Sequence, residues 1–113
     1  MPAGKKHGAG GLDRARLEAL IEEATVDCYD ETEQAVGLFA TIQDHLHLPF
    51  TTRILGVEVA VVAVEQGDDD SVVAVCERGG ERQRVPLLDL PLPSPPPEGA
   101  EWVAAYRHWA RHH

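Results

Sequence analysis

The hydrophobic pattern of this chain changes its period at Pro49, and this change constrains the fold more than any other feature. Before Pro49, apolar residues recur at helical spacing in two stretches, 12–24 and about 30–47. From Phe50 onward, β-branched residues gather in short runs that are separated by Gly and Asp, a pattern typical of strands and turns. Helices followed by strands predict an α+β domain.

The two N-terminal helices have recognisable starts. Asp13 is placed to cap the first helix, and Asp30 to cap the second. Asp30 and Glu33 also have the spacing of a capping box, in which the side chain of each residue accepts a hydrogen bond from the backbone amide of the other. Pro49 is expected to end the second helix.

Three segments after Pro49 are predicted to form strands. The first covers 51–65 with a bend at Gly56, the second 71–78 and the third 82–90. Gly79 and Gly80 predict a hairpin turn between the last two. The stretch 61–64 is expected to be buried on both faces. We therefore expect a small, bent antiparallel sheet of three or four strands, forming a partial barrel.

The C-terminal part combines a proline-rich segment with a third helix. Residues 91–97 predict extended polyproline-type backbone that acts as a spacer. Residues 99–111 predict a helix, in which Trp102, Tyr106 and Trp109 recur at helical spacing. Such an aromatic stripe is typical of a core face that docks on the sheet.

The chain of 113 residues predicts a single domain. Its boundaries are expected at 12–111, preceded by a disordered Gly- and Lys-rich tail at 1–11. Two cysteines are too few for a disulfide framework and indicate a reducing compartment. With no signal peptide and no apolar run long enough to span a bilayer, the expected location is the cytoplasm.

The charge distribution is strongly one-sided. The net charge of −9 argues against nucleic acid and against an anionic membrane surface as partners. From Leu17 to Glu77 there are fourteen acidic residues and one base, Arg53. The densest group, called the acidic knot below, consists of Asp27, Asp30, Glu31 and Glu33.

Carboxylates this close repel each other unless a positive charge lies among them. No nearby side chain supplies it, and ligands that offer only oxygen favour Ca²⁺, with Mg²⁺ as the second choice. The alternative is a solvated acidic face in which Asp30, Glu31 and Glu33 complement the dipole of the second helix. Neither the knot nor the segment after Asp68 has the spacing of an EF-hand loop.

Other clusters are weaker candidates for chemistry. Asp68, Asp69 and Asp70 predict a hairpin tip that could hold a weak ion. The histidine pairs, His45 with His47 and His108 with His112, lack a third ligand for zinc.

No arrangement typical of an enzyme is present. Acidic neighbours disfavour a reactive thiolate at Cys28, and Cys76 lies in an apolar strand. The chain has neither the Ser-His-Asp order of a catalytic triad nor a glycine-rich phosphate loop, so we expect no enzymatic activity.

Several motifs together resemble a known family. They are V-D-C-Y-D-E-T-E-Q at 26–34, I-L-G-V-E-V at 54–59, and the segment from V-P-L-L-D-L through the prolines to E-G-A-E-W at 98–102. The chain is similar to the small bacterial calcium-binding proteins without EF-hands first described from cyanobacteria (CcbP type). This resemblance implies an acidic protein that binds Ca²⁺ in a buffering or regulatory role. It also implies that the acidic knot is the metal site, with Asp89 as a further candidate ligand.

The leading hypothesis is therefore reversible Ca²⁺ binding, in calcium buffering or signalling, with a regulatory protein as a possible partner. Asp27 and Asp30 would be the primary ligands, Glu31 and Glu33 would support them, and backbone carbonyls would complete the shell. The second hypothesis is a small-barrel protein–protein interaction module without metal. A thiol or metal hydrolase is the third and weakest.

Overall fold

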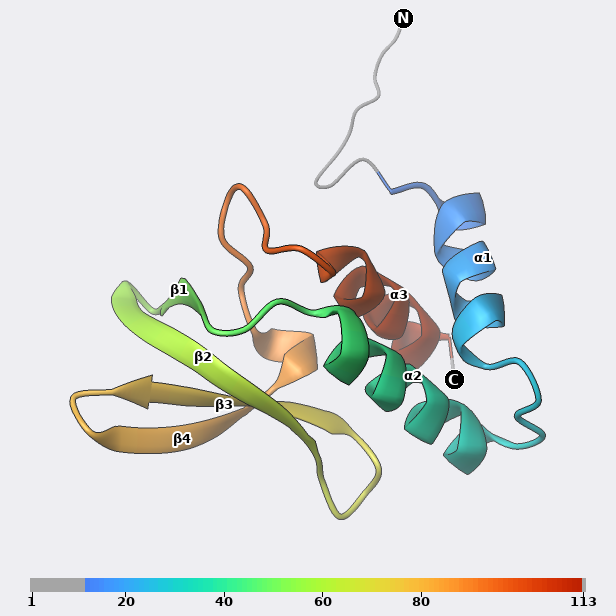
Figure 1. Cartoon of the computed structure of the whole chain (residues 1–113), viewed down its shortest axis with the longest axis horizontal. Helices are drawn as coiled ribbons and strands as arrows, with labels where there is room; N and C mark the ends of the chain where they lie inside the picture. The colour runs from blue at the N-terminus through green and yellow to red at the C-terminus, as the bar shows by residue number, and fades with distance from the viewer. Residues whose placement is uncertain (1–11, 113) are drawn as a thin grey trace, which may run out of the picture.

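The computed structural model describes residues 12–112, so the tail predicted at 1–11 lies outside the described residues. The elements follow in the order α1 (Arg14–Ala24), α2 (Glu31–His45), β1 (Phe50–Ile54), β2 (Val57–Gln66), β3 (Val72–Arg78), β4 (Glu81–Pro86), η2 (Leu87–Asp89) and α3 (Ala100–Arg111). The four strands form one open antiparallel sheet in the order β1-β2-β3-β4. The predicted α+β architecture of helices, sheet and final helix is confirmed (Figure 1).

Both N-terminal helices begin as the sequence predicts. The Asp13 carboxylate accepts a hydrogen bond from the Arg16 amide, and the Asp30 carboxylate accepts one from the Glu33 amide. Each bond satisfies one of the free amides of a first helical turn. Helix α2 ends slightly earlier than predicted, with Leu46 in extended conformation as its C-cap.

The first predicted strand is in fact two strands. Leu55 and Gly56 both have positive φ angles, 51° and 80°, and they close a tight hairpin between β1 and β2. Two positive φ angles in a two-residue loop are the signature of a type I′ turn, whose twist matches that of the flanking strands. The sequence analysis predicted only a bend here, because leucine is not a residue that favours positive φ.

The third predicted strand was too long. Strand β4 ends at Pro86, and residues 87–89 form the short helix η2, so the alternation seen in the sequence does not continue to Leu90. In β2, a shift of register between Val61 and Ala63 marks a bulge. Because of this shift Val61 and Val64 are both buried while Val62 and Ala63 are only half-buried, so the expected burial of 61–64 on both faces holds only in part.

Helix α2 packs against β2 on one face of the sheet, here called the inner face, while α1 packs against α3 and α2. The core joins Leu38 and Ile42 of α2 to Val61, Ala74 and further apolar residues of the strands. In Figure 1 the helices lie beside one end of the sheet, while the tips of the β1–β2 and β3–β4 hairpins extend away from them. Part of the inner face therefore continues beyond the helices.

The aromatic stripe of α3 is core, as predicted, but α3 packs chiefly against α1 and α2 and not on the sheet. Trp102, Tyr106 and Trp109 are all buried. The Tyr106 hydroxyl accepts a hydrogen bond from the Val72 amide at 3.0 Å, and the Trp109 indole donates one to the Gln34 side chain at 3.0 Å. These bonds tie α3 to the start of β3 and to α2.

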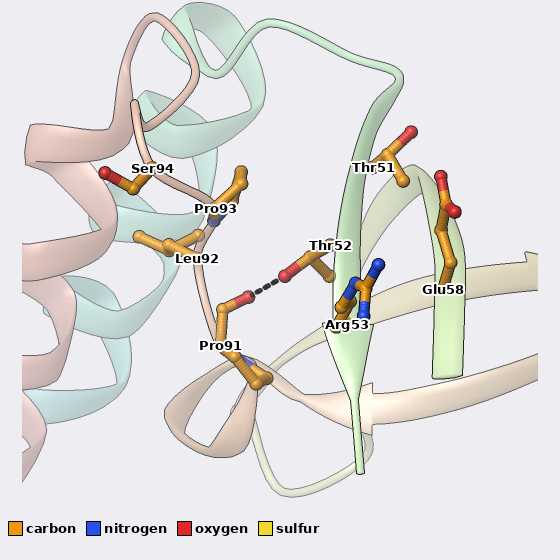
Figure 2. Close-up of a pocket in the computed structure, with 8 residues that line it drawn as sticks. All are labelled: Thr51, Thr52, Arg53, Glu58, Pro91, Leu92, Pro93 and Ser94. Atoms are coloured by element: carbon orange, nitrogen blue, oxygen red, sulfur yellow. Dashed lines mark hydrogen bonds between the residues drawn. The ribbon is translucent and has the colours of Figure 1, made fainter. Parts of the chain in front are cut away.

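The proline-rich segment is anchored at both ends. Figure 2 shows its start beside β1, where the buried Thr52 hydroxyl donates a 2.6 Å hydrogen bond to the Pro91 carbonyl. At its other end the Glu98 carbonyl accepts from the His47 amide at 2.8 Å. Gly99 follows with φ of 88°, and a Cβ there would overlap the His45 backbone. Only glycine fits this contact, which explains the Glu98-Gly99 motif before α3.

Candidate metal centre

The acidic knot lies where α1 gives way to α2. Asp27 is in the loop after α1 and has a positive φ of 67°, Asp30 is the N-cap of α2, and Glu31 and Glu33 stand in its first turn. All four side chains belong to exposed residues. In Figure 1 this loop forms the outer edge of the helical half of the molecule, away from the sheet.

Two of the four carboxylates hold the backbone in place. Besides the bond from the Glu33 amide to Asp30 Oδ1 (2.8 Å), the Tyr29 amide donates to Glu33 Oε1 at 2.6 Å. The predicted capping box is therefore present, except that Glu33 reaches the Tyr29 amide one residue before the cap. Each bond uses one oxygen, and a carboxylate has two oxygens with which to accept.

The end of α1 that adjoins the knot is negative. The last turn of α1 has no basic residue, and its exposed Glu22 and Glu23 adjoin the loop. The end of α1 at Ala24 places these two acids next to the knot. The free carbonyls of a helix C-terminus add partial negative charge.

No cation among residues 12–112 neutralises the knot. The ion pairs in this part of the chain are Arg14–Glu18, Arg82–Glu77, Arg84–Glu65 and His108–Glu18. None of them includes a carboxylate of the knot, so the mutual repulsion of these acids is left to solvent and to dissolved ions.

The donors suit a hard cation, but they do not form a closed cage. Across residues 12–112, no three side chains of His, Cys, Asp or Glu converge closely enough to hold a metal ion together. Ca²⁺ prefers oxygen ligands in flexible geometry and takes several from backbone carbonyls and water. The knot therefore fits Ca²⁺ by the chemistry of its oxygens, and closure around an ion would require its exposed side chains to move together.

Asp89 is separate from the knot. It lies in η2, the short orange turn of Figure 1, which packs against β3 and α3. The buried part of the Arg107 guanidinium donates to the carbonyls of Leu87 and Leu90 in this turn. Burial lowers the pKa of Arg107, repulsion by Arg111 adds to that effect, and attraction by Asp89 opposes it. Asp89 thus has a cationic neighbour, unlike the acids of the knot.

The second acidic cluster forms a hairpin tip, as predicted. The Gly67 amide donates to the Ser71 carbonyl at 2.7 Å, which closes the turn between β2 and β3. Asp69 Oδ1 accepts from the Ser71 hydroxyl at 2.6 Å and from its amide at 3.1 Å. The two bonds from Ser71 lower the pKa of Asp69. This carboxylate is therefore already engaged by the turn itself.

The histidines do not form a transition-metal site in the described chain. The rings of His108 and His112 meet edge to face, with 4.4 Å between their centroids, and His108 Nε2 lies 3.7 Å from Glu18 Oε2, which also pairs with Arg14. His45 lies against Trp102 instead, at 5.3 Å.

The cysteines differ in environment. Cys76 is buried in the core, and this burial raises the pKa of its thiol, while Cys28 is half-buried beside Gly37. Both thiols are free.

A second concave region lies between β1 and the proline-rich segment. This cleft of about 380 Å³ is shown in Figure 2, with Thr51, Arg53 and Glu58 on the strand side. Arg53 and Glu58 stand opposite each other in the β1–β2 ladder. One carboxylate beside one guanidinium is a poor site for a cation, so this cleft does not compete with the knot.

Comparisons with known proteins give one matching family model and two solved structures with a similar fold. A family model described as calcium binding, of the CcbP type, matches residues 18–110. The fold resembles the crystal structure of Anabaena CcbP, with a TM-score of 0.67 and 19% identity over 91% of this chain and 95% of that one. It also resembles a calcium-binding protein in its calcium-binding form, with a TM-score of 0.64 and 20% identity over 85% of this chain and 90% of that one.

No curated protein matches this chain in sequence. In the part of the chain that the structure describes, no helix is both long and apolar enough to cross a bilayer.

Proposed function

The chain belongs to the CcbP-type family of calcium-binding proteins, and we propose that it binds Ca²⁺ reversibly at the junction of α1 and α2. The family match at residues 18–110 includes this whole junction. The role that follows is calcium buffering or signalling, the latter with a regulatory protein as partner. No step in this function requires catalysis by the chain.

One observation carries the proposal. The four carboxylates of the acidic knot lie within residues 27–33 at the junction of α1 and α2, and no ion pair of the described residues includes them. A divalent cation bound there removes the repulsion among these carboxylates, and this relief contributes favourably to the free energy of binding. A solvated acidic face elsewhere would lack this contribution.

The four residues of the knot would have different roles in binding the ion. Asp27, in the loop, and Asp30, at the cap, would be the primary ligands, with Glu31 and Glu33 in support and backbone carbonyls of the loop completing the shell. Asp30 and Glu33 already hold the loop backbone through their amide bonds, so they would also fix the start of α2 when the ion binds. Asp89 is the weakest of the five candidates, because Arg107 lies beside it.

The expected selectivity is Ca²⁺ over Mg²⁺. Mg²⁺ demands a near-ideal octahedron and gives up water reluctantly, whereas Ca²⁺ accepts irregular shells of six to eight oxygens. A loop whose carboxylates are exposed and do not converge in advance suits the more tolerant ion.

The test is isothermal titration of the chelator-treated full chain with Ca²⁺ and with Mg²⁺, in the wild type and in two matched variants. Asp30→Asn and Asp13→Asn each replace an N-cap aspartate by a residue that still accepts the same amide bond (2.8 and 2.9 Å). Of these two caps, only Asp30 belongs to the knot. Asp13 lies at the start of α1, beside Arg14 and Arg16.

We expect Asp30→Asn to weaken Ca²⁺ binding about tenfold or more and Asp13→Asn to leave it unchanged. Dissociation constants for the wild type should fall in the micromolar to millimolar range, on the order of sensor-type or weak sites. Equal affinities of both variants would contradict the proposed site. No heat from Ca²⁺ up to several millimolar, roughly the weak limit of such sites, would contradict calcium binding.

A further inference from the structure

The inner face of the sheet has an uncovered, apolar end. Between the two hairpins that extend beyond the helices lies a groove of about 760 Å³, with Ile54, Val57, Val59 and Val85 on its walls. Ile54, Val59 and Val85 pack against the hydrophobic core and are only partly buried. The groove is thus a continuation of the core surface that no element among residues 12–112 covers.

One apolar side chain at the edge of this groove is almost fully exposed to solvent. Leu55, at the tip of the β1–β2 hairpin, is 99% exposed and also lines the groove. Its φ of 51° is a conformation that asparagine and glycine favour in this turn type and leucine does not. Leucine at this position therefore carries backbone strain and gains no burial within the described chain, and together with the adjoining apolar groove this points to a contact outside it.

The charges around the groove are balanced, although the whole chain has a net charge of −9. The lining of the groove contains the acids Glu77 and Glu81 and the bases Arg78 and Arg82, and Glu77 and Arg82 form a 2.7 Å ion pair. Two copies of this face can therefore meet with opposite charges paired across the contact, despite the negative net charge of each chain.

We propose that this face is the interface of a symmetric homodimer, in which Leu55 of each copy enters the groove of the other. A two-fold axis requires a self-complementary patch, and a protruding leucine beside an apolar groove meets that requirement. The same axis lets Arg78 of one copy face acids of the other. This inference is independent of the proposed calcium site, which lies at the opposite, helical side of the molecule.

The test is sedimentation equilibrium of the full chain over a range of concentrations, in the wild type, Leu55→Asn and Leu88→Asn. Leu88 is a matched control, because it is an exposed leucine (46%) in η2 that does not line the groove. The wild type and Leu88→Asn should show average masses that rise from 12.3 kDa toward twice that value as concentration increases. Leu55→Asn should weaken dimerisation about tenfold or more, because the apolar anchor is lost.

Thermal unfolding at a concentration where the chain is monomeric separates this role from a purely structural one. Asparagine suits φ of 51° better than leucine, so Leu55→Asn should melt at the same or a higher temperature than the wild type. A wild-type chain that stays monomeric at all concentrations would overturn the proposal. So would a dimer that survives Leu55→Asn, or a Leu55→Asn monomer less stable than the wild type.

Discussion

The acidic residues of this chain differ in the hydrogen bonds and ion pairs that already stabilise their carboxylates. Asp69 accepts two hydrogen bonds from Ser71 within its own turn, and its pKa is lowered by them. Asp27 and Glu31 are exposed, and no ion pair of the described part includes them. A carboxylate that is already satisfied gains less from a cation than one surrounded only by other acids. The knot should therefore bind more tightly than the hairpin tip.

The first prediction compares these two clusters. The combined change of Asp68, Asp69 and Asp70 to Asn should leave the tightest Ca²⁺ affinity within about twofold of the wild type, since a hairpin tip encloses an ion poorly. Glu31→Gln removes one charge from the knot and should clearly weaken Ca²⁺ binding. Calorimetric titration of both variants decides the point. Loss of binding in the hairpin variant alone would show that the wrong acidic cluster has been chosen.

A second prediction at this scale concerns the two thiols. Cys76 is buried and its pKa is raised by burial, so little of it is thiolate at neutral pH, whereas Cys28 is half-buried. Iodoacetamide should label Cys28 much faster than Cys76 in the folded chain. Mass spectrometry of peptides after timed labelling measures both rates, and denatured protein is the control in which the two should be similar. Faster labelling of Cys76 in the native state would contradict the packing described for β3.

At the scale of elements, the close approach of Gly99 to the end of α2 fixes how α3 leaves the proline-rich segment. The Glu98 carbonyl binds the His47 amide, and the next residue turns with φ of 88° directly against the His45 backbone. This contact connects two helices that are more than fifty positions apart in the sequence. A tertiary contact therefore requires glycine at position 99.

The third prediction tests this contact with two glycines of positive φ. Gly99→Ala introduces both a strained φ and an overlap with the His45 backbone, and it should destabilise the fold by about 2 kcal/mol or more. Gly80→Ala has a similar φ of 83° but no atom within 4 Å of the new Cβ, so it should cost only about 1 kcal/mol. Urea unfolding gives both values. Equal losses would mean that strain alone, and not the contact with α2, makes glycine necessary at position 99.

Local patterns predicted much of this fold, and what they missed depends on contacts distant in sequence. Helical spacing and the caps Asp13 and Asp30 placed the first two helices to within a few residues. The β1–β2 hairpin was missed because Leu55 adopts a backbone conformation that its side chain disfavours. The strand predicted at 82–90 was too long, because Arg107 of α3 holds the end of that segment in a helical turn.

The same limit applies to the candidate site. The capping box of Asp30 and Glu33 involves residues only three apart and was predictable from their spacing. The position of Asp89 was not, because its neighbour Arg107 comes from another element. Whether the knot residues bind the ion remains a prediction that rests on their charge and on the family resemblance.

At the scale of the whole molecule, net charge and metal binding act on the same free energy of unfolding. A chain with a net charge of −9 is destabilised by self-repulsion, which any salt screens in part. An ion that binds only the folded state adds a separate term, about 2.7 kcal/mol at a hundredfold excess over its dissociation constant. The two effects differ in their dependence on the identity of the ion.

The fourth prediction uses that difference. Saturating CaCl₂ should raise the melting temperature of the chelator-treated chain by roughly 10 °C, given the usual relation between stability and melting temperature for a domain of this size. NaCl matched in ionic strength should raise it much less. Differential scanning calorimetry measures both shifts, and Asp30→Asn should reduce the Ca²⁺ effect. Equal shifts from the two salts would indicate screening without a specific site.

Binding of Ca²⁺ at the α1–α2 junction can be followed residue by residue in amide NMR spectra of the labelled chain during a Ca²⁺ titration. We expect the largest shifts on residues 25–33, with the Tyr29 and Glu33 amides among them because their hydrogen-bond acceptors are candidate ligands. Residues 67–71 and the β3–β4 hairpin should change little. Shifts that centre on residues 67–71, or on the turn that contains Asp89, while residues 25–33 stay unperturbed would contradict binding at this junction.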